Sequence, residues 1–182
     1  AGVIILRYYY NNNRVLRSQK SEDVESLEKN DSVGPISNVR HKIVVMGAAK
    51  VGKSSIISQF LYGTFSPKYK RTVEEMHHGD FNVAGVHLTL DILDTSGAYE
   101  FPAMRALSIS SADAFILVYD VTDASTFEEA RTLRDQIHET KCSTNVPIVI
   151  VGNKIDLTGN REVSFYYLFP ARSIESDFSN FV

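Results

Sequence analysis

Residues 47–54, Gly-Ala-Ala-Lys-Val-Gly-Lys-Ser, constrain this chain more than any other stretch, because they fit the phosphate-binding pattern G-x-x-x-x-G-K-[ST]. Residues 41–46 before them, with the apolar run 43–46, indicate a buried strand, and residues 54–61 after them indicate a helix. The sequence therefore predicts a strand, a phosphate-binding loop and a helix in direct succession.

The residue types in this loop each have a physical purpose. Gly47 and Gly52 allow backbone turns that a Cβ atom would block. The N–H groups of the loop then face phosphate oxygens at the positive end of the following helix. In this pattern Lys53 reaches the β- and γ-phosphates, and the Ser54 hydroxyl is a ligand of Mg²⁺.

Length and charge narrow the class of protein. A chain of 182 residues suits one domain, and a net charge of −3 gives no strong field that would favour nucleic acid. The single cysteine, Cys142, excludes a disulfide framework and indicates a reducing compartment, which predicts a cytoplasmic protein. No apolar run reaches the roughly 18 residues that a membrane-spanning helix needs.

Composition divides the chain into three parts. Residues 1–39 form a leader with a short apolar and aromatic run followed by polar sequence, and we expect it to be mostly disordered. A targeting segment is the alternative for its first residues, although Arg7 interrupts the apolar run. Residues 40–163 read as the compact domain, and residues 164–182 as an atypical tail.

The apolar pattern predicts an α/β fold with a doubly wound, mostly parallel sheet. Residues 43–46, 114–119 and 148–151 are rich in Val and Ile and do not alternate, which is typical of strands covered on both faces. Residues 80–83 and 86–92, joined by a turn at Ala84-Gly85, alternate instead and predict a hairpin. The sheet should therefore contain one antiparallel edge pair.

A helix should follow residues 122–124. Residues 125–128, Ser-Thr-Phe-Glu, fit a capping box, which would make Ser125 the N-cap. Apolar residues then recur at helical spacing and should face the core: Phe127, Ala130, Leu133 and Ile137.

Two further stretches follow predicted strands and point to the kind of nucleotide. Asp94 begins the sequence Asp-Thr-Ser-Gly and can hold Mg²⁺, while the N–H of Gly97 can meet a γ-phosphate. Residues 153–156 read Asn-Lys-Ile-Asp. There Asn153 would tie its loop to the phosphate-binding loop, the stem of Lys154 would lie over the base, and Asp156 would accept from guanine N1 and N2. Adenine has no such donor pair, so the site would reject it.

With these motifs in this order, residues 40–157 resemble a Ras-type small GTPase. Within that family, residues 93–105 and 107–109 most resemble the dexamethasone-induced Ras and Rhes group. The resemblance implies a P-loop NTPase fold and a molecular switch in signal transduction. Such a switch binds GTP or GDP with Mg²⁺ and slowly hydrolyses GTP to GDP. A P-loop ATPase or kinase is disfavoured, because Asn-Lys-Ile-Asp has no role there.

The resemblance also assigns residues. Thr72 falls where the family places a Mg²⁺-binding threonine, Phe65 where a ring packs on guanine, and Tyr69 where a tyrosine closes over the phosphates. The implied catalytic residues are Lys53, Thr72 and Gly97, and the implied Mg²⁺ ligands are Ser54, Thr72 and Asp94. The implied nucleotide contacts are Gly47, Ala48, Ala49, Lys50, Val51, Gly52, Lys53, Ser54, Ser55, Phe65, Tyr69, Thr72, Asp94, Gly97, Asn153, Lys154, Asp156 and Leu157.

Two residues depart from the family pattern. Ala98 stands where the family carries a glutamine that positions water, and alanine cannot orient a water by hydrogen bonding. The methyl group of Ala49 would crowd the path of a helper arginine toward the γ-phosphate. Two alternatives to a switch therefore stay open: a guanine-nucleotide-binding module with little or no hydrolysis, and a truncated, non-functional product.

The end of the chain departs further. Residues 164–182 match no part of the family, and neither its Ser-Ala-Lys base-capping loop nor a C-terminal lipidation box is found. We therefore expect a C-terminally incomplete domain, with one sheet edge and one apolar sheet face uncovered. We also expect a monomer whose chain encodes no membrane anchor, with association with the plasma membrane reserved for a full-length form. Its effector, exchange-factor and activating proteins would bind residues 65–75 and 94–104.

Overall fold

The computed structural model describes residues 5–9, 38–83, 85–97 and 102–163. Its strands form one six-stranded sheet in the order β1-β6-β5-β2-β4-β3. The strands are β1 (Ile5–Tyr9), β2 (Asn38–Met46), β3 (Glu75–Val83), β4 (Val86–Asp94), β5 (Ala114–Asp120) and β6 (Ile148–Asn153). The helices are α1 (Lys53–Tyr62), α2 (Pro102–Ser111) and α3 (Ala124–Lys141), with a short 3-10 turn, η1 (Thr158–Asn160). None of these helices is long and apolar enough to span a membrane.

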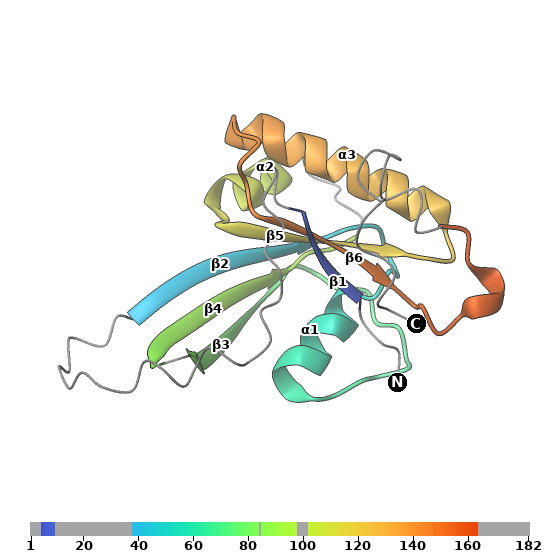
Figure 1. Ribbon diagram of the computed structural model, residues 1–182, viewed down its shortest axis with the longest axis horizontal. Helices are drawn as coiled ribbons and strands as arrows, with labels where there is room; N and C mark the ends of the chain where they lie inside the picture. Colours follow the sequence, from blue (N-terminus) through green and yellow to red (C-terminus); the bar gives the residue numbers. More distant parts are fainter. Residues whose placement is uncertain (1–4, 10–37, 84, 98–101, 164–182) are drawn as a thin grey trace, which may run out of the picture.

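Helices cover both faces of the sheet, with α1 on one face and α2 and α3 on the other (Figure 1). The hydrophobic core is accordingly divided into two clusters, one on each face of the sheet. One cluster joins apolar residues of β2, β5 and α3, such as Val44, Leu117 and Ile137, and the other joins β2, β4 and α1 through Val45, Ile92 and Ile57. This arrangement confirms the doubly wound α/β fold, because the central strands are apolar on both faces.

The centre of the sheet is parallel, as β2 pairs in parallel with β4 and β5, and β5 pairs in parallel with β6. At one edge β3 runs antiparallel to β4, from the pair Glu75 and Asp94 to the pair Val83 and Val86. The predicted antiparallel edge pair is therefore confirmed, and both of its strands are longer than the alternating residues suggested.

The opposite edge holds a second antiparallel pair, which the sequence pattern did not predict. Residues 5–9 form β1 and pair with β6, with Ile5 opposite Gly152 and Tyr9 opposite Ile148. For these residues the expectations of a disordered leader and of a bare sheet edge are wrong. The segment Ile-Leu-Arg-Tyr-Tyr has high strand propensity, and the edge of β6 offers unpaired N–H and C=O groups. Asn38 and Val39, which were also assigned to the leader, belong to β2. Residues 1–4 and 10–37 of the predicted leader and the predicted tail, residues 164–182, lie outside the described residues.

The start of α3 also differs from the expectation. Asp123, and not Ser125, is the N-cap, and its carboxylate accepts from the Ser125 amide at 3.0 Å. The expected core residues Phe127, Ala130, Leu133 and Ile137 are buried. The helix thus begins earlier than the capping box predicted, because an aspartate is an equally good cap.

A cavity of about 250 Å³ lies between β6 and α3. Its apolar wall comes from Val146, Ile148 and Ile150, and its polar wall from Arg134, Asp135, His138 and Thr144. The described part of the chain therefore leaves a hollow there with a mixed, rather than a purely apolar, surface.

Candidate functional site

Two glycines shape the loop between β2 and α1. Gly47 has a φ of +139° and Gly52 a φ of +100°, both in the region that favours glycine. A Cβ atom on Gly47 would lie 2.0 Å from the carbonyl oxygen of Val118, and one on Gly52 would lie 2.2 Å from Nδ2 of Asn153. The loop is therefore packed directly against β5 and β6, and neither glycine can carry a side chain without movement of its neighbours.

Lys53, the first residue of α1, is only 6% exposed. Its ammonium group donates to the carbonyl oxygens of Gly47 and Ala48, both at 2.7 Å. Burial lowers the pKa of Lys53 to about 8, although the nearby Asp94 carboxylate favours the charged form. The loop thus holds a buried cation. The negative charge of a bound phosphate would offset the free-energy cost of burying it.

The remaining predicted loop residues differ in exposure. Ala48 and Val51 are buried, Ala49 and Lys50 are exposed, and Ser55 is half-buried in α1. Only the side chains of Ala49 and Lys50 are thus freely accessible.

Three oxygen-bearing side chains meet beside the start of α1. The Ser54 and Thr72 hydroxyl oxygens are 2.7 Å apart, and Ser54 also hydrogen-bonds the Asp94 carboxylate. Asp94 is 1% exposed, and its Oδ1 has no hydrogen-bond partner within the described part of the chain. Burial raises its pKa, against the influence of Ser54 and Lys53. A buried carboxylate oxygen without a partner, next to two hydroxyl groups, fits a hard cation such as Mg²⁺.

The segment after β4 is anchored next to the phosphate-binding loop. Thr95 is fully buried, and its hydroxyl donates to the Val45 carbonyl oxygen at 2.7 Å. A Cβ atom on Gly97 would lie 2.3 Å from the backbone N and Cα of Ala49. Gly97 is therefore brought against the loop, as the resemblance implies. Ala98 lies outside the described residues.

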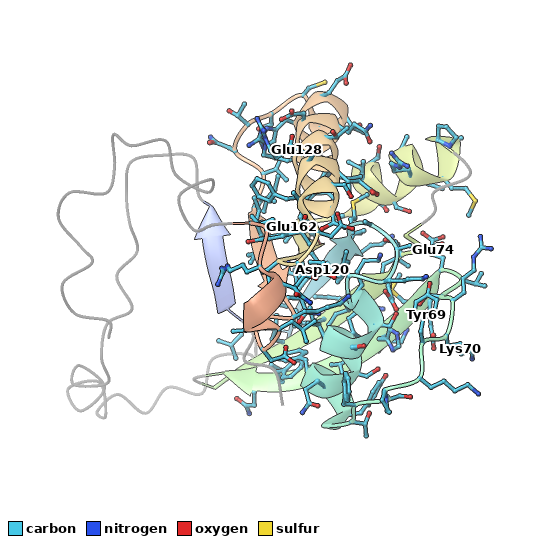
Figure 2. The ribbon with its side chains drawn as sticks, turned by 90° about the vertical axis from the view of Figure 1, so that its right-hand side faces the viewer. Tyr69, Lys70, Glu74, Asp120, Glu128 and Glu162 are labelled. Atoms are coloured by element: carbon cyan, nitrogen blue, oxygen red, sulfur yellow. The ribbon has the colours of Figure 1, made fainter. Side chains whose placement is uncertain are left out.

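The two aromatic residues implied by the resemblance are both on the surface. The ring of Tyr69 approaches the phosphate-binding loop, with Nζ of Lys50 5.7 Å from its centroid, and Figure 2 shows it beside Lys70 on the segment after α1. Phe65 is 69% exposed, so its ring is not part of the buried group around Lys53. Glu74, at the end of this segment, accepts from the Ser108 hydroxyl of α2 at 3.1 Å.

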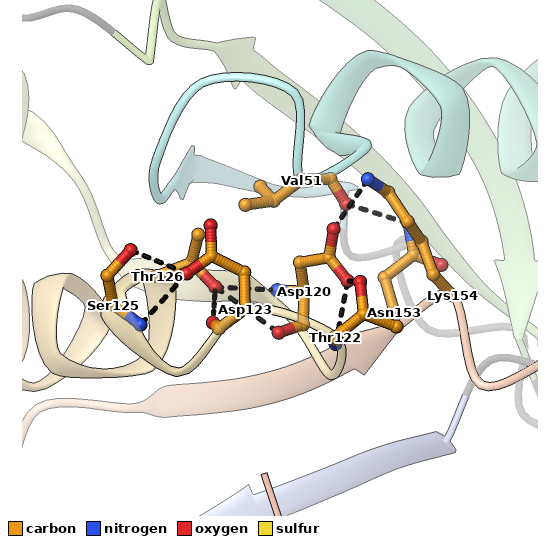
Figure 3. Close-up of polar contacts among 8 residues, drawn as sticks. All are labelled: Val51, Asp120, Thr122, Asp123, Ser125, Thr126, Asn153 and Lys154. Atoms are coloured by element: carbon orange, nitrogen blue, oxygen red, sulfur yellow. Dashed lines mark hydrogen bonds and ion pairs between the residues drawn. The ribbon is translucent and has the colours of Figure 1, made fainter. Parts of the chain in front are cut away.

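The turn after β6 contacts the phosphate-binding loop. Nδ2 of Asn153 donates to the Val51 carbonyl oxygen at 2.8 Å (Figure 3), which is the tie expected from the sequence. Lys154 adopts a left-handed backbone conformation with a φ of +64°. Asp156 and Leu157 follow on the exposed turn, where a base edge could reach the carboxylate.

Sequence reasoning missed Asp120, the last residue of β5. Its carboxylate forms an ion pair with Lys154, at 2.5 Å between Oδ2 and Nζ. Polar side chains at the carboxyl ends of parallel strands commonly line ligand sites. The position of Asp120, directly after a buried apolar run, was therefore a signal that could have been used.

The fold and the geometry together define a domain of the P-loop NTPase class, with the loop after β2 and the segments after β4 and β6 at the carboxyl ends of parallel strands. A model of the Ras family matches residues 42–172. The expectation that residues 164–182 match no part of the family is therefore wrong for residues 164–172. The chain is also similar to the GTP-binding protein Rhes of Homo sapiens and of Mus musculus, with 46% identity over 124 residues in each case. These alignments cover 64% of this chain and 47% of each relative, so the chain spans about half the length of the curated relatives it matches.

The chain belongs to the Ras family, since the family model covers well over half of it. The resemblance to the Rhes group is likewise confirmed.

Proposed function

We propose that this protein is a switch that binds GTP or GDP together with Mg²⁺ and slowly hydrolyses GTP in signal transduction. The observation that carries the proposal is the convergence of three elements on one loop. Lys53 lies inside the loop, Ser54 and Thr72 meet at 2.7 Å beside it, and Asn153 bonds Val51 at 2.8 Å. The family membership and the names of the two relatives support the same function.

Different residues would bind the phosphates and the metal ion. Lys53 would neutralise charge on the β- and γ-phosphates, and the N–H of Gly97 would donate to the γ-phosphate. Ser54, Thr72 and Asp94 would hold Mg²⁺, which when bound neutralises the charge that develops on the transferred phosphoryl group. Catalysis of this kind consists of positioning and charge stabilisation, which suits a site made of preset donors.

Base selection should depend on Asp156. Replacing Asp156 by asparagine removes the negative charge and puts an NH2 donor in place of one of the two oxygens that would accept from guanine N1 and N2, so GTP binding should weaken by about 1.5–3 kcal/mol. The preference should also shift toward xanthine nucleotide, whose base has an acceptor where guanine has an amino group. Equilibrium titration of the wild type and the variant with GTP, XTP and ATP measures both effects.

The same titration tests the proposed function. The wild type should bind GTP and GDP and reject ATP. Asp123→Asn is the control, because it makes the same charge change at a helix cap outside the base site. Binding of ATP as tight as GTP would contradict the guanine site, and unchanged GTP affinity in Asp156→Asn would contradict the role of Asp156.

Hydrolysis should be slow, because Ala98 has no side chain that can orient the attacking water. The turnover should be at or below the intrinsic level known for Ras itself, on the order of 10⁻⁴ per second. Ala98→Gln should raise it, and more so together with Ala49→Gly, as measured by single-turnover GTP hydrolysis. A rate well above about 10⁻² per second, or no response to either change, would mean that other groups position the water. A wild type that binds GTP without any turnover would favour the alternative of a pure binding module.

Partner proteins would bind the segments 65–75 and 94–104. The first of these exposes apolar side chains, with Val73 82% and Phe65 69% exposed, and α2 nearby exposes Leu107 at 70%. Exposed apolar groups beside a nucleotide site are suited to effector, exchange-factor and activating proteins. We further propose that the protein acts as a monomer in the cytoplasm, with association with the plasma membrane in a full-length form.

A further inference from the structure

Asp120 is held in one orientation by contacts on both of its carboxylate oxygens (Figure 3). Oδ2 accepts from Nζ of Lys154 at 2.5 Å, and Oδ1 accepts from the amide and the hydroxyl of Thr122 at 2.9 and 2.7 Å. The amide of Asp120 itself donates to the hydroxyl of Thr126 at 3.0 Å. With only 7% of the residue exposed, the carboxylate has little freedom to turn.

The electrostatic surroundings keep this carboxylate charged. Burial by itself would raise the pKa of Asp120, but the hydrogen bonds from Lys154 and Thr122 outweigh it and leave the pKa below its ordinary value. The side chain of Asp120 is 10% exposed and that of Lys154 is 34% exposed. The pair is thus partly shielded from solvent, so salt screens it less than it would a surface pair.

The sheet register explains why this pair can form. Asp120 lies opposite Asn153 in the parallel pairing of β5 with β6. Lys154 is the next residue, and its left-handed backbone turns the chain away from the strand direction. The ion pair therefore connects the end of β5 to the turn that carries the base-recognition residues, and Asn153 connects the same turn to Val51.

We propose that Asp120 is a positioning residue for guanine nucleotide, which fixes the side chain of Lys154 so that its methylene stem forms a preset wall of the base site. This inference rests on the proposed function and extends it to a residue that does not itself touch the nucleotide. Without the carboxylate, the ammonium group of Lys154 would turn into solvent, and the stem would have to be ordered again at each binding event.

A double-mutant cycle tests the inference, using the full 182-residue chain loaded with GDP that carries a fluorescent N-methylanthraniloyl group. Asp120→Asn keeps the shape and removes the charge, and Lys154→Met keeps most of the stem and removes the ammonium. Each single change should speed nucleotide release about tenfold. The double variant should release no faster than either single variant, because both changes remove the same ion pair.

The controls separate positioning from simple loss of structure. Asp123→Asn makes the same charge change three residues away, at a cap that asparagine also serves, and should leave release unchanged. Additive effects of about a hundredfold in the double variant would overturn the inference, since Asp120 would then act without Lys154. Unchanged or slower release from Asp120→Asn would overturn it as well.

A second measurement applies if Asp120→Asn does not fold. Rising sodium chloride should speed release from the wild type more than from Lys154→Met, because only the wild type has the ion pair to screen. Equal salt dependence would contradict the inference. A wild type that holds no guanine nucleotide would contradict the proposed function itself, whereas a wild type that binds it but shows uncoupled variants would contradict only the role of Asp120.

Discussion

Lys53→Met should abolish measurable nucleotide binding and at the same time stabilise the nucleotide-free protein. The ammonium group is buried and its pKa is lowered from 10.5 to about 8, so folding opposes its protonation. A shift of this size corresponds to about 3 kcal/mol of destabilisation at neutral pH, which methionine would remove. Binding is lost because the phosphates no longer meet a cation. Urea denaturation and GDP titration of both proteins measure the two effects.

The dependence on pH identifies the cause. Between about pH 8 and 10.5 the folded wild type binds fewer protons at Lys53 than the unfolded chain, so its stability should rise with pH across this window. Lys53→Met should lack that rise. Lys50→Met is the matched control, because Lys50 is an exposed lysine in the same loop. If Lys53→Met and the wild type showed the same pH dependence, burial of the ammonium would not be the cause.

Gly47→Ala should destabilise the fold by more than about 3 kcal/mol. The added Cβ atom would lie 2.0 Å from the backbone carbonyl oxygen of Val118, and a φ of +139° is unfavourable for alanine. Because the contact is with backbone in the centre of the sheet, no side-chain rotation can relieve it. Urea denaturation of the nucleotide-free protein measures the loss.

Gly63→Ala provides the control for Gly47→Ala. Gly63 also has a positive φ, +63°, but a Cβ atom there would meet nothing within 4 Å. Its cost should therefore be only that of a left-handed alanine, about 1–2 kcal/mol. Equal losses in the two variants would show that backbone conformation, and not the contact with Val118, determines the requirement at Gly47.

The central strands and the motif-bearing loops could be predicted because local sequence determines them. Val44, Val45 and Met46 form an unbroken apolar run, which is stable only in a strand covered on both faces, and all three are buried. The glycine positions of the phosphate-binding loop are determined in the same local way, by the backbone turns that they allow.

Contacts between distant segments could not be predicted in the same way. The four apolar and aromatic residues at positions 5–9, which flank Arg7, can pair with any open edge, and nothing in their pattern specifies β6. The pairing of Asp120 with Lys154 depends on the left-handed turn at Lys154, a conformation that lysine seldom adopts. Asp123 and Ser125 are both residue types that are favoured at an N-cap, so the sequence alone did not determine which of them caps α3.

The pairing of β1 with β6 has a consequence for the order of folding. Residues 5–9 leave the ribosome well before their partner, residues 148–152, has been synthesised. Closing so long a loop is entropically costly, so this edge should be the last part of the sheet to form. Until then, β6 of one molecule is open to β1 of another. At high concentration, exchange of this strand between two copies is therefore the misassembly to which the fold is most exposed.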